Sequence, residues 1–159
     1  MKRIKVKVIS PMFVALLILG ILYLVFDRYQ LSRVSGNSMY PAVKDREVVV
    51  VQKKKQPQRY DLIAFEQNDH LLIKRIIGLP GDQFIRSGDR LWVGNGDTAF
   101  DFSYTITVSP QIADILPLSG MIQEGEYLVV GDALKTSRDS RTFGFVSTED
   151  VFGKVRTFF

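Results

Sequence analysis

An uncharged apolar stretch near the N-terminus constrains the fold of this chain more than any other feature. Residues 8–26 are 19 consecutive residues without a charged side chain, and most of them are Leu, Ile, Val or Phe. As a helix this stretch would be about 28 Å long, which matches the hydrocarbon core of a bilayer. Pro11 lies near its start, where a helix does not need the missing N–H. The stretch therefore predicts a single transmembrane helix.

The charges around this stretch predict its orientation. Residues 1–7 contain four basic side chains, and no acidic residue precedes Asp27. We therefore expect a cytoplasmic basic tail over 1–7, an anchor over 8–26 and an extracytoplasmic domain over 27–159, held at the cell membrane by a single pass. A cleavable signal peptide has the same basic start. However, the stretch is long for that role and residues 23–28 offer no small-residue cleavage site.

Composition excludes several classes of function for the rest of the chain. Four of the 21 basic residues lie in the tail, so residues 27–159 carry 17 basic and 17 acidic side chains. The net charge of +4 is therefore a topology signal, and we expect no nucleic-acid partner. The chain has no cysteine, which excludes disulfides, thiolate zinc sites and a cysteine nucleophile. We expect no metal and no cofactor.

The remainder reads as a mainly β domain with long irregular loops. β-Branched and aromatic runs bounded by turn residues predict strands over 47–51, 61–65, 71–78, 89–93, 126–130 and 151–159. Helical periodicity is weak, with short helical turns at most over 110–115 and 147–151. We interpret 27–34 as a juxtamembrane linker and 94–123 as an insertion or long loop beside the core.

Two short segments each supply one residue of a candidate catalytic pair. Ser38 lies two residues after Gly36 in an expected turn, and Lys74 lies inside an otherwise apolar strand. A serine hydroxyl needs a base to become a nucleophile, and a buried lysine loses its charge more easily than an exposed one. Each residue alone is better explained as an ordinary turn serine or a solvated strand lysine. The only histidine, His70, is expected at a solvated hairpin tip.

The motifs around these residues resemble those of the type I signal peptidases, the Ser-Lys peptidases of the S26 family. The matching segments are Ser-Met-Tyr-Pro at 38–41, Lys-Arg-Ile-Ile-Gly-Leu-Pro-Gly-Asp at 74–82 and the stretch 131–144. The resemblance implies that Ser38 is the nucleophile and Lys74 the general base. It also implies that Ser137 hydrogen-bonds the lysine, and that Asp139 and Arg141 form a supporting ion pair.

The resemblance further implies a substrate and its binding site. The expected function is cleavage of signal peptides from exported preproteins after a small-any-small pattern, by an enzyme that also contacts the lipid bilayer. The residues expected to line its shallow pockets are Val34, Met39, Leu72 and Ile73. At the position of Gly36 a Gram-negative relative would place a serine that serves the oxyanion hole. Glycine there indicates the Gram-positive type, with the Ser38 N–H as the main oxyanion donor.

Alternatives to this interpretation remain at the sequence level. Ala133 stands where the family usually has asparagine, which leaves open a catalytically silent, membrane-anchored module that binds exported peptides. A specialised peptidase, such as one that matures a pilin, would share every motif. LexA-like autoproteases use the same Ser-Lys chemistry, but they carry a DNA-binding segment where this chain has its apolar stretch.

Overall fold

The structure, a computed structural model, describes residues 10–94 and 102–157. The predicted tail over 1–7 and the first two residues of the predicted anchor lie outside the described residues. The described residues are mainly β, as the sequence predicts, with one long helix at the N-terminal end.

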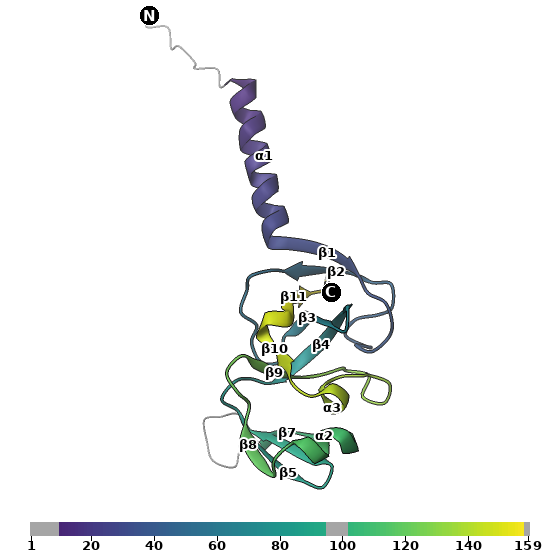
Figure 1. The fold of residues 1–159 in the computed structure, drawn as a ribbon. Coiled ribbons are helices and arrows are strands. Elements are labelled where there is room, and N and C mark those ends of the chain that lie inside the picture. The colour runs from purple at the N-terminus through teal and green to yellow at the C-terminus, as the bar shows by residue number, and fades with distance from the viewer. Residues whose placement is uncertain (1–9, 95–101, 158–159) are drawn as a thin grey trace, which may run out of the picture.

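The long helix, α1 (Pro11–Arg28), corresponds to the predicted anchor. Pro11 occupies the first turn, where its missing N–H has no intrahelical partner to bond, and Ser10 is the N-cap. The helix ends two residues beyond the predicted boundary. Figure 1 shows it standing away from the β domain, and none of its residues is buried. Within the described residues it is the one helix long and apolar enough to cross a membrane.

The predicted juxtamembrane linker over 27–34 is wrong. Helix α1 continues directly into strand β1 (Tyr29–Arg33), which pairs antiparallel with β2 (Val48–Gln52). The helix end is also tied to the residues after β2, because the Lys53 N–H donates to the Arg28 carbonyl at 2.8 Å. Strand β1 has little local signal, because its five residues are stabilised as a strand by pairing with β2 rather than by their own apolar pattern.

A seven-stranded sheet forms the part of the domain next to α1. Its strand order is β1-β2-β11-β3-β4-β9-β10, and all the pairs are antiparallel. The remaining strands are β3 (Leu62–Gln67), β4 (His70–Gly78), β9 (Glu126–Val130), β10 (Val146–Ser147) and β11 (Val151–Arg156). Two residues, Asn68 and Asp69, join β3 to β4. Both have positive φ, as a tight hairpin turn requires.

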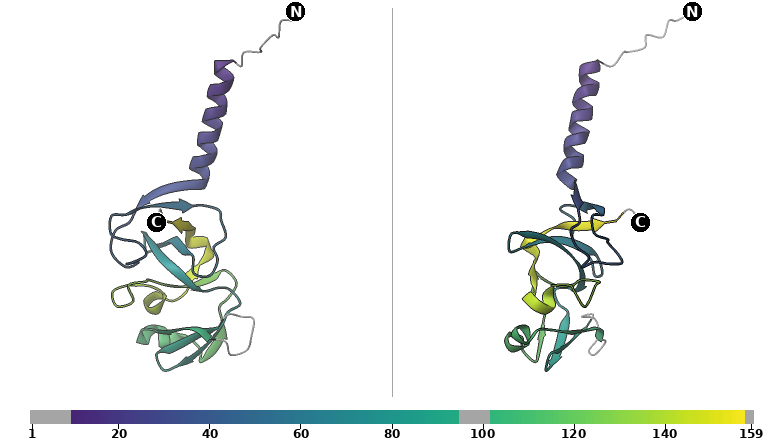
Figure 2. Two further views of the ribbon diagram at one scale, coloured as in Figure 1. Left: turned by 180° about the vertical axis from the view of Figure 1, so that it is seen from behind. Right: turned by 90° about the vertical axis from the view of Figure 1, so that its right-hand side faces the viewer.

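A second sheet of four strands lies at the end of the domain far from α1 (Figures 1 and 2). Its order is β7-β6-β5-β8, and its strands are β5 (Gln83–Ser87), β6 (Arg90–Gly94), β7 (Phe102–Thr107) and β8 (Ser119–Met121). The interpretation of 94–123 as an insertion or long loop is therefore wrong outside residues 95–101, which are not described. The segment supplies two strands of this sheet and several buried side chains.

The short helical turns were predicted correctly. Helix α2 spans Pro110–Ile115 and is capped by the Ser109 hydroxyl, which accepts from the Ile112 N–H. A single 3₁₀ turn, η1, spans Thr148–Asp150. A third helix, α3 (Ser140–Phe143), lies in the 131–144 segment and was not predicted.

Three apolar clusters form the core. Two of them cover opposite faces of the seven-stranded sheet, one around Val49, Val51 and Ala64 and the other around Ile63, Phe65 and Ile76. The third joins the two sheets, because it combines Ile77, Leu128 and Val130 of β4 and β9 with side chains of the four-stranded sheet. Strand β4 therefore contacts all three clusters and is the central element of the fold.

Candidate active site

Strand β4 holds Lys74 in the apolar interior. Side chains alternate across a strand, so Lys74 shares a face with Leu72 and Ile76, which both pack into the Phe65 cluster. Lys74 is only 2% exposed. Burial lowers the pKa of its amine below the ordinary value; the nearby Asp139 carboxylate opposes this shift and Arg141 adds to it. A lysine in this setting gives up its proton more readily than one in water.

Ser38 lies in the turn that joins β1 to β2. The turn is anchored by Met39 and Val43, which are buried in the core directly after the serine. Before the serine, Gly36 has φ +95° and donates its N–H to the Asp45 carboxylate at 2.8 Å. Glycine suits this left-handed backbone because it has no Cβ. The turn that carries Ser38 is thus fixed by buried apolar side chains after the serine and by the Gly36–Asp45 hydrogen bond before it.

The two predicted catalytic side chains meet. The Lys74 Nζ lies 2.8 Å from the Ser38 Oγ. Among the residues that the structure describes, Lys74 makes no ion pair, and the Ser38 N–H has no hydrogen-bond partner. The arrangement therefore places a desolvated amine against a hydroxyl, with an unused N–H donor beside it.

The 131–144 segment packs against the serine from the other side. The Ala133 N–H donates to the Ser38 carbonyl at 3.0 Å. Ser137 lies against Gly131, where even a Cβ atom would collide with its side chain. The Ser137 hydroxyl is buried and has no hydrogen-bond partner within the described residues, so the expected bond to Lys74 is not formed. The contact to Ser38 comes from the backbone, so it does not need the amide side chain that the family usually has at position 133.

The predicted supporting pair is present. Arg141 contacts Asp139 at 2.8 Å, and Asp139 is completely buried. Burial alone would raise the pKa of the Asp139 carboxyl. Hydrogen bonds from Arg141 and from the Gly131 N–H, together with the polarity of the nearby Ser137 hydroxyl, lower it below its ordinary value. Asp139 also caps α3 through the Arg141 N–H. The Asp139 carboxylate therefore links Gly131 and Arg141, which lie near the two ends of the 131–144 segment.

Sequence reasoning missed two further ion pairs of the same framework. Arg59 binds Asp82 through two contacts of 2.6 Å, and Arg75 binds Asp132 at 2.6 and 2.8 Å. Asp82 is buried and also accepts the Leu79 N–H, which closes the turn after β4. The signal for both pairs lay in the motifs, where Arg75, Asp82 and Asp132 occupy matching positions, but a charged residue in a motif does not identify its partner.

The five residues predicted to bind substrate do not form one group. Leu72 lines the same cavity as Ser38 and Lys74. Val34, Met39 and Ile73 pack together in the cluster on the other face of the sheet, and Met39 is only 2% exposed. Gly36 lies in the serine turn, two residues before Ser38. Their role in substrate binding stays a prediction.

The cavity at Ser38 and Lys74 has a volume of about 400 Å³. Its wall includes Leu72 and Phe143, and its other lining residues are Gln67, Asn68, His70 and Arg138. His70 is exposed near the tip of the β3–β4 hairpin, as predicted. The polar lining is not evident from the sequence, because these residues come from two separate segments, the β3–β4 hairpin and the residues before α3.

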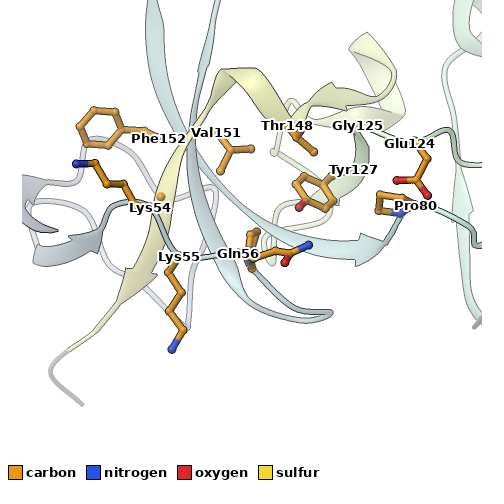
Figure 3. A pocket seen from close by; sticks show the side chains of 12 residues that line it. Lys54, Lys55, Gln56, Pro80, Glu124, Gly125, Tyr127, Thr148, Val151 and Phe152 are labelled. Atoms are coloured by element: carbon orange, nitrogen blue, oxygen red, sulfur yellow. The ribbon is translucent and has the colours of Figure 1, made fainter.

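A second hollow of about the same size lies away from this site. Figure 3 shows it between the loop that carries Lys54 and Lys55 and the segments around Glu124 and Phe152. It contains neither Ser38 nor Lys74. Across the described residues, no three His, Asp or Glu side chains gather closely enough to hold a metal ion. The Ser38 cavity is thus the candidate active site.

Comparison with known proteins extends the match to the whole chain. The family model for signal peptidase, peptidase S26, matches residues 5–159. The chain is 34% identical over 140 residues to signal peptidase IB of Staphylococcus aureus, covering 77% of this chain and 73% of that protein. It is 33% identical over 161 residues to signal peptidase I of Bacillus caldolyticus, covering 91% of this chain and 86% of that protein.

A solved structure is also similar. The crystal structure of a signal peptidase I from Enterococcus faecalis V583 aligns with 31% identity and a TM-score of 0.46, covering 64% of this chain and 98% of that one. The conclusion rests on the family model and on the two relatives. By these matches, the chain belongs to the signal peptidase family, peptidase S26.

Proposed function

We propose that this protein is a membrane-anchored serine endopeptidase that removes signal peptides from exported preproteins with a Ser38–Lys74 dyad. The observation that carries the proposal is the 2.8 Å separation of the Lys74 Nζ and the Ser38 Oγ in a site where the lysine is 2% exposed. Among the described residues, no carboxylate lies within ion-pairing distance of the amine, and a charged ammonium there would also lack most of its water. The neutral amine is therefore the favoured form, and a neutral amine is a base.

The first half of the reaction forms an acyl-enzyme. The Lys74 amine takes the proton of the Ser38 hydroxyl while the Ser38 oxygen attacks the carbonyl carbon of the cleaved bond. The carbonyl oxygen becomes an oxyanion, and the free Ser38 N–H is positioned to donate to it. The C–N bond then breaks, and the Lys74 ammonium returns its proton to the leaving amine. The mature chain departs with a free N-terminus.

The second half hydrolyses the ester. Lys74 is neutral again, so it can take a proton from water as the water attacks the ester carbon. The ester C–O bond breaks, and the proton returns to the Ser38 oxygen. Ser137 supports both halves in this proposal, because its buried hydroxyl lies beside the serine backbone and can orient the lysine amine. Asp139 and Arg141 would act indirectly by holding that segment in place.

The free edge of β4 suits an extended substrate. Residues 71–74 of β4 pair with β3 on one side, whereas the pairing with β9 includes only Arg75, Ile76 and Gly78. In the described residues no strand occupies the other edge of 71–74. A peptide could add there as a strand and bring its cleaved bond to Ser38. In this proposal Val34, Met39, Leu72 and Ile73 limit the residues before the cut to small side chains.

The membrane part of the proposal follows from α1 and from the tail. The apolar helix would span the bilayer, with residues 1–7 in the cytoplasm and residues 27–159 on the outer side. The substrates would be preproteins whose signal peptides emerge at that surface. The relatives named above are called signal peptidases, which agrees with this substrate class.

One experiment tests the proposal directly. The full chain, purified in detergent or in lipid vesicles, is incubated with a precursor that carries an Ala-X-Ala signal peptide, and the cut is located by mass spectrometry. We expect a single cut after the second alanine. Ser38→Ala is the control, and its products should be absent. Cleavage by the alanine variant at the normal rate would refute the dyad, and an uncleaved precursor would refute the function.

A further inference from the structure

The lining of the active-site cavity contains positively charged and neutral polar side chains but no negatively charged one. Beyond the reacting pair and the apolar wall, it contains the guanidinium of Arg138, the imidazole of His70 and two side-chain amides. No carboxylate is among the lining residues. Glu66 and Asp69, the acidic residues of the same hairpin, are exposed and do not line the cavity. The cavity therefore offers hydrogen-bond donors and positive charge to whatever enters it.

Arg138 is the unusual member of this set. Two neighbouring arginines, Arg75 and Arg141, are each bound to an aspartate. Arg138 is exposed and makes no ion pair or hydrogen bond to any described residue. Its backbone is nonetheless well fixed, because it lies between Ser137, whose N–H is bound to the Ala133 carbonyl, and the buried Asp139. A guanidinium that is held at the cavity and left unpaired is available to a ligand.

The two faces of β4 separate the cavity that includes Arg138 from most of the predicted small-residue pockets. Side chains at 70, 72 and 74 share one face of β4 and line the cavity, whereas Val34, Met39 and Ile73 pack on the other face. The walls predicted to accept the small residues before the cut thus belong largely to the opposite face. Because side chains alternate along an extended peptide, one of the first two residues after the cut would point toward the cavity.

We propose that this cavity is a subsite for an acidic side chain within the first two residues of the mature protein, and that Arg138 determines the preference. This inference rests on the proposed function. An aspartate or glutamate carboxylate there would accept from the Arg138 guanidinium and from the amides of Gln67 or Asn68. A lysine or arginine at the same substrate position would face like charge and no acceptor carboxylate. The result is a charge preference added to the small-residue requirement.

The test compares matched peptides. Each has the same Ala-X-Ala signal region, and the first or second mature residue is Asp, Asn or Lys. Full-length wild-type protein should cleave the Asp peptide about two- to fivefold faster in kcat/KM than the Asn peptide, since one exposed ion pair has about this effect. The Lys peptide should be slowest. Raising the ionic strength should shrink the differences, because salt screens exposed charges.

Variants of Arg138 then separate charge from structure. Arg138→Ala should bring the ratio of Asp to Asn cleavage to about one, and Arg138→Glu should favour the Lys peptide. Arg138→Lys should keep part of the preference for Asp. Lys135→Ala is the matched control, because Lys135 is an exposed cation of the same segment that does not line the cavity. It should leave the ratio unchanged.

The outcomes are distinguishable from those of the proposed function. Equal cleavage of the Asp and Asn peptides by wild-type protein would overturn the acidic subsite while leaving the peptidase intact. A preference that survives in Arg138→Glu would assign it to other residues and overturn the role of Arg138. If no peptide of the series is cleaved at all, the proposed function fails first.

Discussion

The two sheets of this protein differ in what their residues are used for. The seven-stranded sheet and its connections carry Ser38, Lys74 and the 131–144 segment, whereas the four-stranded sheet carries none of the predicted site residues. Both share one apolar cluster through Ile77, Leu128 and Val130. In the first sheet many positions are fixed by specific contacts at the site. In the second sheet, a buried position mainly requires an apolar side chain of the right size.

The contrast follows from the interactions that hold each region. Around the dyad, several buried polar groups are held by specific hydrogen bonds, such as the bond from the Gly131 N–H to Asp139 at 2.8 Å. In the four-stranded sheet the buried side chains are apolar, such as Leu91, Val93 and Ile106. Hydrogen bonds are directional and packing is not, so small changes near the dyad should affect activity first. Changes in the second sheet should affect stability first.

The largest effect is expected at Ser38. Ser38→Ala should lower kcat by about 10³-fold or more, because Ser38 is the proposed nucleophile that forms the acyl-enzyme. Thermal unfolding of the variant should match wild type within a few degrees, since the hydroxyl contributes little to packing. Precursor cleavage and circular dichroism measure the two quantities. A large loss of stability would show that this serine belongs to the fold as much as to the chemistry.

Lys74 should set the pH dependence and should reduce stability. The rate should rise with pH through a pKa below that of an ordinary lysine, because only the neutral amine is a base. The folded state binds that proton more weakly than the unfolded chain, so its contribution to stability also rises with pH across the interval between the two pKa values. Lys74→Arg should be inactive at every pH. Lys74→Met should be inactive yet more stable, and a less stable variant would contradict this account.

Two glycines offer a matched pair, one beside the dyad and one in the apolar cluster that joins the two sheets. A Cβ at Gly131 would lie 2.7 Å from the Ser38 carbonyl oxygen and would collide with Ser137. Gly131→Ala should therefore displace the dyad and lower activity about 10²-fold. A Cβ at Gly78 would lie 2.9 Å from Leu128, where the sheets join. Gly78→Ala should lower stability by about 1–3 kcal/mol with little change in activity per folded molecule. Swapped outcomes would remove the distinction between the regions.

The smallest effect on chemistry is expected in β7. Ile106 is buried in the cluster that joins the sheets, and Ile106→Ala should lower the free energy of unfolding by about 2–4 kcal/mol. Its neighbour Thr105 is exposed, so Thr105→Ala is the control and should change stability by less than about 0.5 kcal/mol. Denaturant titration measures both. Activity per folded molecule should stay at the wild-type level, and a selective loss of activity would extend the site into this sheet.

The same contrast explains which parts of the fold were predictable. Strands such as β2 and β9 were predicted within one residue because β-branched runs between turn residues are a strong local signal. Strand β8 has no such signal, since its residues are Ser, Gly and Met. It forms because Gly120 lacks a side chain and Phe84 packs against its backbone, which places the Phe84 Cζ 2.7 Å from where a Cβ would be. Close approach of two distant segments cannot be seen in a local pattern.

The site was predictable only in part for a related reason. Ser38, Lys74, Asp139 and Arg141 lie in recognisable motifs, and the structure brings each pair together. The polar lining of the cavity was not predicted, because Arg138 and Asn68 are 70 positions apart in the sequence and belong to different elements. A motif identifies reacting groups, whereas the shape and charge around them depend on how the hairpin and the 131–144 segment meet.

The direct passage from α1 into β1 has a consequence for how a cleavage site would be chosen. The helix end is clamped to the domain, because Lys53 binds the Arg28 carbonyl and Lys54 binds Asp27 at 2.8 Å. No flexible tether lies between them to vary the distance. With α1 embedded as proposed, Ser38 would stand at a constant height over the lipid surface. The enzyme would then select the bond to be cleaved by its distance from the membrane, a set number of residues beyond the substrate's own apolar segment.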